Sequence, residues 1–129
     1  MTPIRAFVLD DEPLAVERLL RLLRQTGRVE IAGSATDPDD ALAWLRSNHT
    51  DVLFLDIEMP ERDGFTLIAA LPETLRPAVV FVTAYDQHAV RAFAADAIDY
   101  LLKPVESERL KQAVERVRTR RAQWSPELV

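Results

Sequence analysis

The segment Asp51-Val-Leu-Phe-Leu-Asp-Ile-Glu-Met-Pro-Glu-Arg-Asp-Gly64 constrains the fold more than any other part of the chain. Its apolar run, residues 52–55, is typical of a strand in the middle of a sheet that is covered on both faces. The run ends on Asp56, and a loop with proline and glycine separates it from a helix expected to begin near Phe65. A carboxylate at the tip of such a strand would lie at the rim of the core, exposed enough to react. For a lone aspartate, the simpler interpretation is that it ends the strand.

Further apolar runs alternate with segments of helical periodicity. The run at 29–35 is the more polar one, so we expect it near an edge of the sheet. Trp44 shares an apolar helix face with Leu45, and we expect it to pack there instead of forming a binding platform. The expected strands are residues 4–9, 29–35, 52–56, 78–82 and 98–102, and the expected helices begin near residues 13, 38, 65 and 86, with a last one around 110–117 that fades at 118–121.

Five strands alternating with five helices predict an α/β fold. We expect a flavodoxin-like three-layer sandwich with a parallel sheet in the order 2-1-3-4-5. A chain of 129 residues has room for one domain with a full core. Its net charge of −5 argues against a nucleic-acid surface, and it contains no cysteine. No signal peptide or membrane span is recognisable, so we expect a cytoplasmic domain without membrane contact.

Polar residues follow the expected strands at one edge of the sheet. Asp10 and Asp11 follow the first strand, Asp56 the third, Thr83 the fourth and Lys103 the fifth. Ligands of open α/β sheets bind at this edge, beside the point where the strand order reverses. The five residues together therefore predict a site, whereas Asp10 and Asp11 alone could be helix-capping acids.

The residue types indicate phosphoryl chemistry at a cation. Close carboxylates repel one another and hold protons unless a cation compensates their charge. An oxygen-preferring ion such as Mg²⁺ suits them, and it favours carboxylates, water and phosphate oxygens as ligands. Lys103 and Thr83 suit the oxygens of a phosphoryl group, and Asp56 would be the nucleophile that forms an acyl phosphate. No glycine-rich phosphate loop is present, so nucleotide binding is not implied.

These motifs resemble the receiver domain of two-component response regulators, over about residues 3–120. The resemblance implies that Asp56 is the phosphoacceptor for a sensor histidine kinase. It implies a Mg²⁺ site formed by Asp10, Asp11, Asp56 and the backbone carbonyl of Glu58. The matching motifs are Asp10-Asp11, Asp56-Ile-Glu-Met-Pro, Asp63-Gly64, Thr83-Ala84 and Lys103-Pro104.

The same resemblance assigns roles at the ends of the last two strands. Thr83 and Tyr100 would be the switch pair, in which the hydroxyl moves to the phosphate while the ring turns inward. Tyr100 could equally be an ordinary core or surface aromatic residue. Lys103 would contact the phosphoryl group, and the peptide bond before Pro104 would be cis, a form found in about 5% of X-Pro bonds.

Residues 82–105 are similar to the receivers of LytTR-type transcription regulators. We therefore expect a receiver domain at residues 1–121, and at 122–129 the beginning of a linker to a DNA-binding domain that this chain lacks. The resemblance also implies a homodimer through the surface of the fourth helix, the fifth strand and the fifth helix. Two residues depart from the pattern: Glu61 replaces a small residue, and Ala94 replaces an acidic one.

Two other functions remain open. A Mg²⁺-dependent phosphohydrolase with Asp56 as nucleophile would need a general acid near it, commonly an aspartate two residues on, where this chain has Glu58. A receiver that only binds partners would not need the complete acidic and lysine set.

Outside the expected site, simpler interpretations hold. We expect His49 and His88 to be surface residues, because neither has a metal-ligand partner at suitable spacing. Arg116 and Arg118 suit a solvated helix end, or could meet Asp96 and Asp99 across a dimer.

Overall fold

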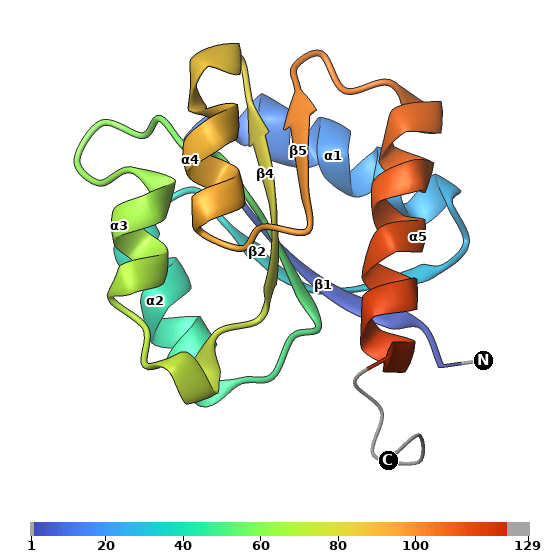
Figure 1. The fold of residues 1–129 in the computed structure, drawn as a ribbon, viewed down its shortest axis with the longest axis horizontal. Coiled ribbons are helices and arrows are strands. Elements are labelled where there is room, and N and C mark those ends of the chain that lie inside the picture. The colour runs from blue at the N-terminus through green and yellow to red at the C-terminus, as the bar shows by residue number, and fades with distance from the viewer. Residues whose placement is uncertain (1, 124–129) are drawn as a thin grey trace.

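The computed structural model describes residues 2–123, with the side chains of residues 90, 93, 122 and 123 excepted. Within this range five strands alternate with five α-helices, as the sequence predicted (Figure 1). The strands are β1 (Ile4–Leu9), β2 (Val29–Ala35), β3 (Val52–Leu55), β4 (Ala78–Thr83) and β5 (Asp99–Leu102). The helices are α1 (Pro13–Gln25), α2 (Pro38–Ser47), α3 (Gly64–Ala69), α4 (Ala89–Ala94) and α5 (Ser107–Gln123), with 3₁₀ turns η1 (Glu73–Leu75) and η2 (Asp86–His88).

The five strands form one parallel sheet in the order β2-β1-β3-β4-β5. This confirms the flavodoxin-like order predicted from the sequence, including the edge position of β2. The central strand β3 is buried along its whole length, because its apolar residues face helices on both sides of the sheet. The strand order reverses between β1 and β3, where their carboxyl ends lie side by side.

Two apolar cores hold the sheet between its helices. Alternate side chains of the strands point to opposite faces, which divides the apolar residues between two layers. One core joins the sheet to α1 and α5, and the other joins it to α2, α3 and α4 (Figure 1). Trp44 packs on the second core, with its ring centroid 4.5 Å from that of Phe7, as predicted.

The helix starts follow their capping residues. The Asp37 side chain accepts a hydrogen bond from the Asp39 amide at 2.8 Å, and that of Asp63 from the Thr66 amide at 2.7 Å. The fourth helix is shorter than predicted, since residues 86–88 form the 3₁₀ turn η2 before α4 begins. The last helix continues to Gln123, so the first two residues of the predicted linker, 122 and 123, are helical. Residues 124–129 of the predicted linker lie outside the described residues.

The first and last parts of the described chain meet at the amino ends of the strands. This edge of the sheet is opposite to the one where Asp10, Asp11 and Asp56 follow their strands. Arg121 in the last turn of α5 donates to the carbonyl oxygens of Thr2 and Pro3, at 2.7 and 3.2 Å. The same guanidinium contacts the Asp51 carboxylate at 3.1 Å, which also accepts the Arg5 amide at 2.7 Å. Among the described residues, none of the helices has the length and apolar character needed to span a membrane.

Candidate functional site

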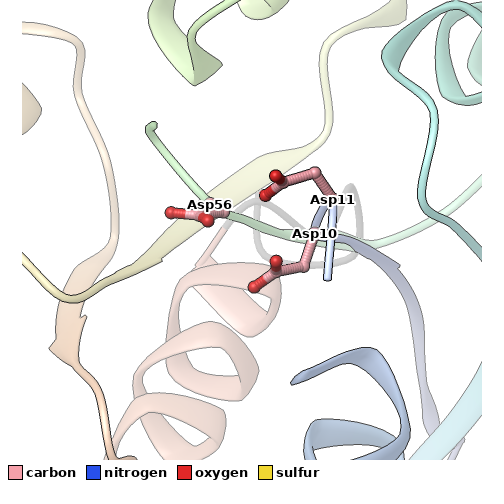
Figure 2. Close-up of side chains that lie close together, drawn as sticks. All are labelled: Asp10, Asp11 and Asp56. Carbon is pink, nitrogen blue, oxygen red and sulfur yellow. The ribbon is translucent and has the colours of Figure 1, made fainter. Parts of the chain in front are cut away.

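Three carboxylates meet at the carboxyl edge of the sheet. Asp10 and Asp11 follow β1, and Asp56 follows β3. Each offers a carboxylate oxygen, and these oxygens all lie within 4.8 Å of one another, with the side chains of Asp10 and Asp11 directed toward Asp56 (Figure 2). Asp10 and Asp56 are buried, whereas Asp11 is partly open to solvent. The structure thus brings together the three acids that the sequence placed at one site.

Gly64 lets the loop after β3 close tightly beneath Asp56. Its amide donates to the Ile57 carbonyl at 2.8 Å. A Cβ atom at this position would lie 2.8 Å from the Asp56 carbonyl oxygen, closer than real Cβ contacts. Glycine at the start of α3 therefore allows the helix to pack against the end of the strand, and this fixes the backbone that carries Asp56.

Lys103 joins β5 to the acids. Its ammonium nitrogen lies 2.6 Å from Asp10 Oδ2 and 3.4 Å from Asp56 Oδ2. The Lys103 amide donates to the Thr83 carbonyl at 2.8 Å, which places the lysine at the end of β4. The peptide bond between Lys103 and Pro104 is cis. The positively charged Lys103 ammonium group therefore lies between two buried carboxylates.

Burial and neighbouring charges shift the protonation of two of the acids, Asp56 and Asp11. Burial and the charge of Asp10 raise the pKa of Asp56 to about 6, although the nearby Lys103 works in the opposite direction. Burial and Asp10 also raise the pKa of Asp11. Burial disfavours the Lys103 ammonium, but its hydrogen bond to Asp10 and the Asp56 charge outweigh this and raise the pKa of the lysine. The site therefore holds more negative charge than one ammonium balances.

The donor set suits a hard divalent cation. In the part of the chain that the structure describes, this cluster contains only carboxylate oxygens, without histidine or cysteine. Such oxygens are the ligands that Mg²⁺ prefers, and Asp11 leaves room for water on its open side. Asp10, Asp11 and Asp56 therefore fit a Mg²⁺ ion, which would also relieve their mutual repulsion.

Thr83 and Tyr100 lie on neighbouring strands, and Tyr85 connects them. Thr83 is fully buried, and its hydroxyl oxygen accepts the Tyr85 amide at 3.4 Å. The half-buried Tyr100 donates its hydroxyl to the Tyr85 carbonyl. Burial raises the pKa of the Tyr100 hydroxyl, which keeps it a donor. Thr83 and Tyr100, the predicted switch pair, therefore both form hydrogen bonds to Tyr85 in the segment that follows β4.

His88 differs from its expected place on the open surface. Its side chain is 20% exposed, and Nε2 lies 2.7 Å from Oε1 of Glu58. Glu58 in turn donates its amide to Asp56 Oδ1 at 3.4 Å. No pattern in the sequence signals this pair, because its members are 30 residues apart and Glu58 lies in a loop without periodicity. His49, by contrast, is an exposed residue, as expected.

The arginines of α5 find acidic partners within the same chain. Asp99 is buried and forms two ion pairs. Its Oδ1 atom lies 2.6 Å from Nη2 of Arg109 and 3.0 Å from Nη1 of Arg116. Burial opposes the Asp99 charge, but the hydrogen bonds from Arg109 and Tyr100 prevail and lower the pKa of Asp99. Arg118 pairs with Glu115 in the same helix. In one chain these groups already form ion pairs, so a dimer is not needed to satisfy them.

The raised pKa of Asp56 predicts a loss of stability as the pH rises in the absence of Mg²⁺. An unfolded aspartate ionises near pH 4, whereas folded Asp56 keeps its proton up to about pH 6. Its ionisation therefore lowers the free energy of unfolding between these values, by roughly 2 kcal/mol after allowance for solvent screening. Urea unfolding in EDTA at pH 4.5 and 7.5 measures this, and Asp56→Asn should remove this part of the loss. An equal pH dependence in both proteins would contradict the shift.

The fold and the acidic edge define a class of protein, the flavodoxin-like α/β domains with a cluster of carboxylates at the carboxyl ends of the strands. Residues 6–115 match the family model described as the response regulator receiver domain. The chain therefore belongs to the response regulator receiver domain family, whose members act in two-component systems.

Relatives and solved structures agree with this family. An uncharacterized response regulatory protein of Vibrio cholerae is 44% identical over 95% of this chain and 53% of its own length. The transcriptional regulatory protein BtsR of Escherichia coli is 37% identical over 98% of this chain and 53% of its own. The chain thus spans about half the length of these curated relatives. The response regulatory domain of mrkE from Klebsiella pneumoniae superimposes with a TM-score of 0.82 at 36% identity, covering 93% of this chain and 99% of that one.

Proposed function

We propose that this receiver domain is a phosphorylation-dependent switch in which Asp56 accepts a phosphoryl group. The observation that carries the proposal is the cluster of three carboxylates with the Lys103 ammonium between two of them. A buried carboxylate at a rigid strand end can act as a nucleophile when nearby positive charge balances the group that it receives. Asp10, Asp11, Asp56 and the Glu58 carbonyl would hold Mg²⁺.

The chain's own residues account for most of the transfer. An Asp56 carboxylate oxygen attacks phosphorus while the bond from phosphorus to the leaving atom of the donor breaks, and the electron pair leaves with that atom. The leaving atom is an imidazole nitrogen when the donor is a phosphohistidine, and an oxygen when it is acetyl phosphate. Lys103 and the Thr83 hydroxyl donate hydrogen bonds to the transferred oxygens. Bound Mg²⁺ would supply positive charge that the phosphoryl oxygens share. Asp10 and Asp11 would orient the ion without reacting.

The phosphoryl group would then change the segment that Thr83 and Tyr100 hold. A Thr83 hydroxyl that turns to the phosphate gives up its contact with the Tyr85 amide. The Tyr100 ring would turn inward and alter the surface formed by α4, β5 and α5. Such a change is a shift between two populated arrangements, driven by new contacts to the phosphate. The donor in the cell would be a sensor histidine kinase.

We also propose that the domain serves a LytTR-type transcription regulator and forms homodimers. Residues 82–105 carry this resemblance, and relatives named transcriptional regulatory proteins are about twice as long as this chain. DNA would then be bound by a domain outside it. The proposed dimer surface exposes Leu102 to 47%, and sedimentation with and without a phosphoryl mimic tests whether this surface associates. Monomers under both conditions would contradict the dimer.

The experiment that tests the proposed function measures the intact mass of the protein after incubation with acetyl phosphate. We expect one phosphoryl adduct in the presence of Mg²⁺, located on Asp56 by reductive peptide mapping, and almost none in EDTA. Sustained release of inorganic phosphate from many phosphomonoesters would favour a phosphohydrolase instead. A folded protein that takes up no phosphoryl group would favour a receiver that only binds partners.

A further inference from the structure

The Glu58 carboxylate lies outside the acidic cluster although Glu58 is close to Asp56 in sequence. Among the described residues, the cluster that could hold a cation consists of Asp10, Asp11 and Asp56. The Glu58 side chain instead reaches the start of the α4 region, where Oε1 lies 2.7 Å from Nε2 of His88. Because an ionised carboxylate has only acceptor atoms, His88 must present its N–H to it. A fourth negative charge is thereby held away from the other three.

His88 is itself fixed by the residues around it. Its ring and that of Phe65 lie in a T-shaped arrangement, with the centroids 6.3 Å apart. Phe65 is buried against Phe81 at 4.8 Å, and the guanidinium of Arg91 lies 4.2 Å above the Phe65 ring. The imidazole therefore packs beside the Phe65 ring and forms a hydrogen bond with the Glu58 carboxylate. A ring held in this way can keep a flexible glutamate in one place.

We propose that His88 is a positioning residue for the phosphoacceptor site, which holds the Glu58 carboxylate beside η2 and so keeps it out of the path of the phosphoryl donor. This inference rests on the proposed function of Asp56. If the hydrogen bond is lost, the Glu58 side chain becomes free to turn toward the acidic cluster. Its charge then attracts a cation more strongly and repels an anionic phosphoryl donor.

Opposite effects on cation binding and phosphoryl uptake distinguish this role from simple loss of structure. In His88→Ala we expect Mg²⁺ to bind more tightly and the rate of adduct formation with acetyl phosphate to fall, each by about three- to tenfold for a partly screened charge. His88→Gln, whose amide can still donate to Glu58, should restore most of both values. Calorimetric titration with Mg²⁺ and intact mass measure the two quantities.

The Glu58→Gln background separates the charge of Glu58 from the packing of His88. Glutamine still accepts a hydrogen bond but has no charge, so His88→Ala should change neither quantity once Glu58 is replaced. The matched control is His49→Ala, since His49 lies 3.1 Å from the Asp51 carboxylate at the opposite edge of the sheet. Its removal should leave both quantities unchanged.

Two outcomes would overturn the inference. One is a weaker affinity for Mg²⁺ in His88→Ala. The other is an equal effect of His88→Ala in the native and Glu58→Gln backgrounds, as expected if His88 only stabilises the loop. Amide hydrogen exchange over residues 86–94 shows how far the segment has loosened in each variant. If the native chain takes up no phosphoryl group, the proposed function fails, but the Mg²⁺ titrations still decide the role of His88.

Discussion

Asp56→Asn is expected to abolish the phosphoryl adduct, from one group per chain to none. The amide is nearly isosteric with the carboxylate but is a poor nucleophile, so the site keeps its shape and loses its acceptor. Because ionised Asp56 is crowded by Asp10 in a buried place, the variant should be at least as stable as the native protein at pH 7.5 in EDTA. Intact mass after incubation with acetyl phosphate and Mg²⁺ measures the adduct, and urea unfolding measures the stability.

The matched control for this variant is Asp40→Asn. Asp40 is an exposed aspartate in the first turn of α2, and it lies outside the acidic cluster. The same chemical change there should leave the adduct intact. An adduct of native size on Asp56→Asn, placed on another residue by peptide mapping, would show that the acceptor is elsewhere.

Lys103→Met is expected to slow adduct formation by about a hundredfold or more, as when a single charged donor is removed from a developing anion. Methionine fills much of the same space without the ammonium that now lies 2.6 Å from Asp10 and 3.4 Å from Asp56. The same loss should strengthen Mg²⁺ binding, because the ammonium no longer competes for Asp10. The rate from intact mass and the affinity from calorimetry should therefore move in opposite directions.

Lys111→Met is the control, since Lys111 is the other lysine of the chain. It lies on the exposed side of α5 and pairs only loosely with Glu108, at 3.3 Å. Neither the rate nor the Mg²⁺ affinity should change in this variant. If Lys103→Met formed the adduct as fast as Lys111→Met, the lysine would have no part in the transfer.

Most of the fold follows from local patterns in the sequence. Fully apolar runs such as β3 form central strands, and the polar run of β2 forms an edge strand. Parallel strands bring their carboxyl ends to one edge, so the meeting of Asp10, Asp11 and Asp56 could be expected from their places in the sequence alone. The helix caps at Asp37 and Asp63 are equally local.

Contacts between side chains distant in the sequence could not be predicted in the same way. The Glu58–His88 pair depends on the direction of two loops, and the periodicity of the sequence does not indicate that direction. The ion pairs of Arg109 and Arg116 with buried Asp99 likewise depend on the packing of α5 against β5. The sequence pattern of residues 86–94 resembles one helix, but the first turn is 3₁₀ and places His88 toward Glu58. These three features, which the sequence did not predict, all lie next to the segment after β4 that the proposed switch would move.

The hydrogen bonds of Arg121 to Thr2 and Pro3 have a practical consequence for engineering. They hold the beginning of the chain and the end of α5 together at one pole of the domain (Figure 1). The carboxylates lie at the other pole, so a fluorophore or an affinity handle fused at either end leaves them unobstructed. A circular permutant that joins these ends by a short peptide should keep its core, and new ends opened in a surface loop near the acids would make a genetically encoded reporter of phosphorylation.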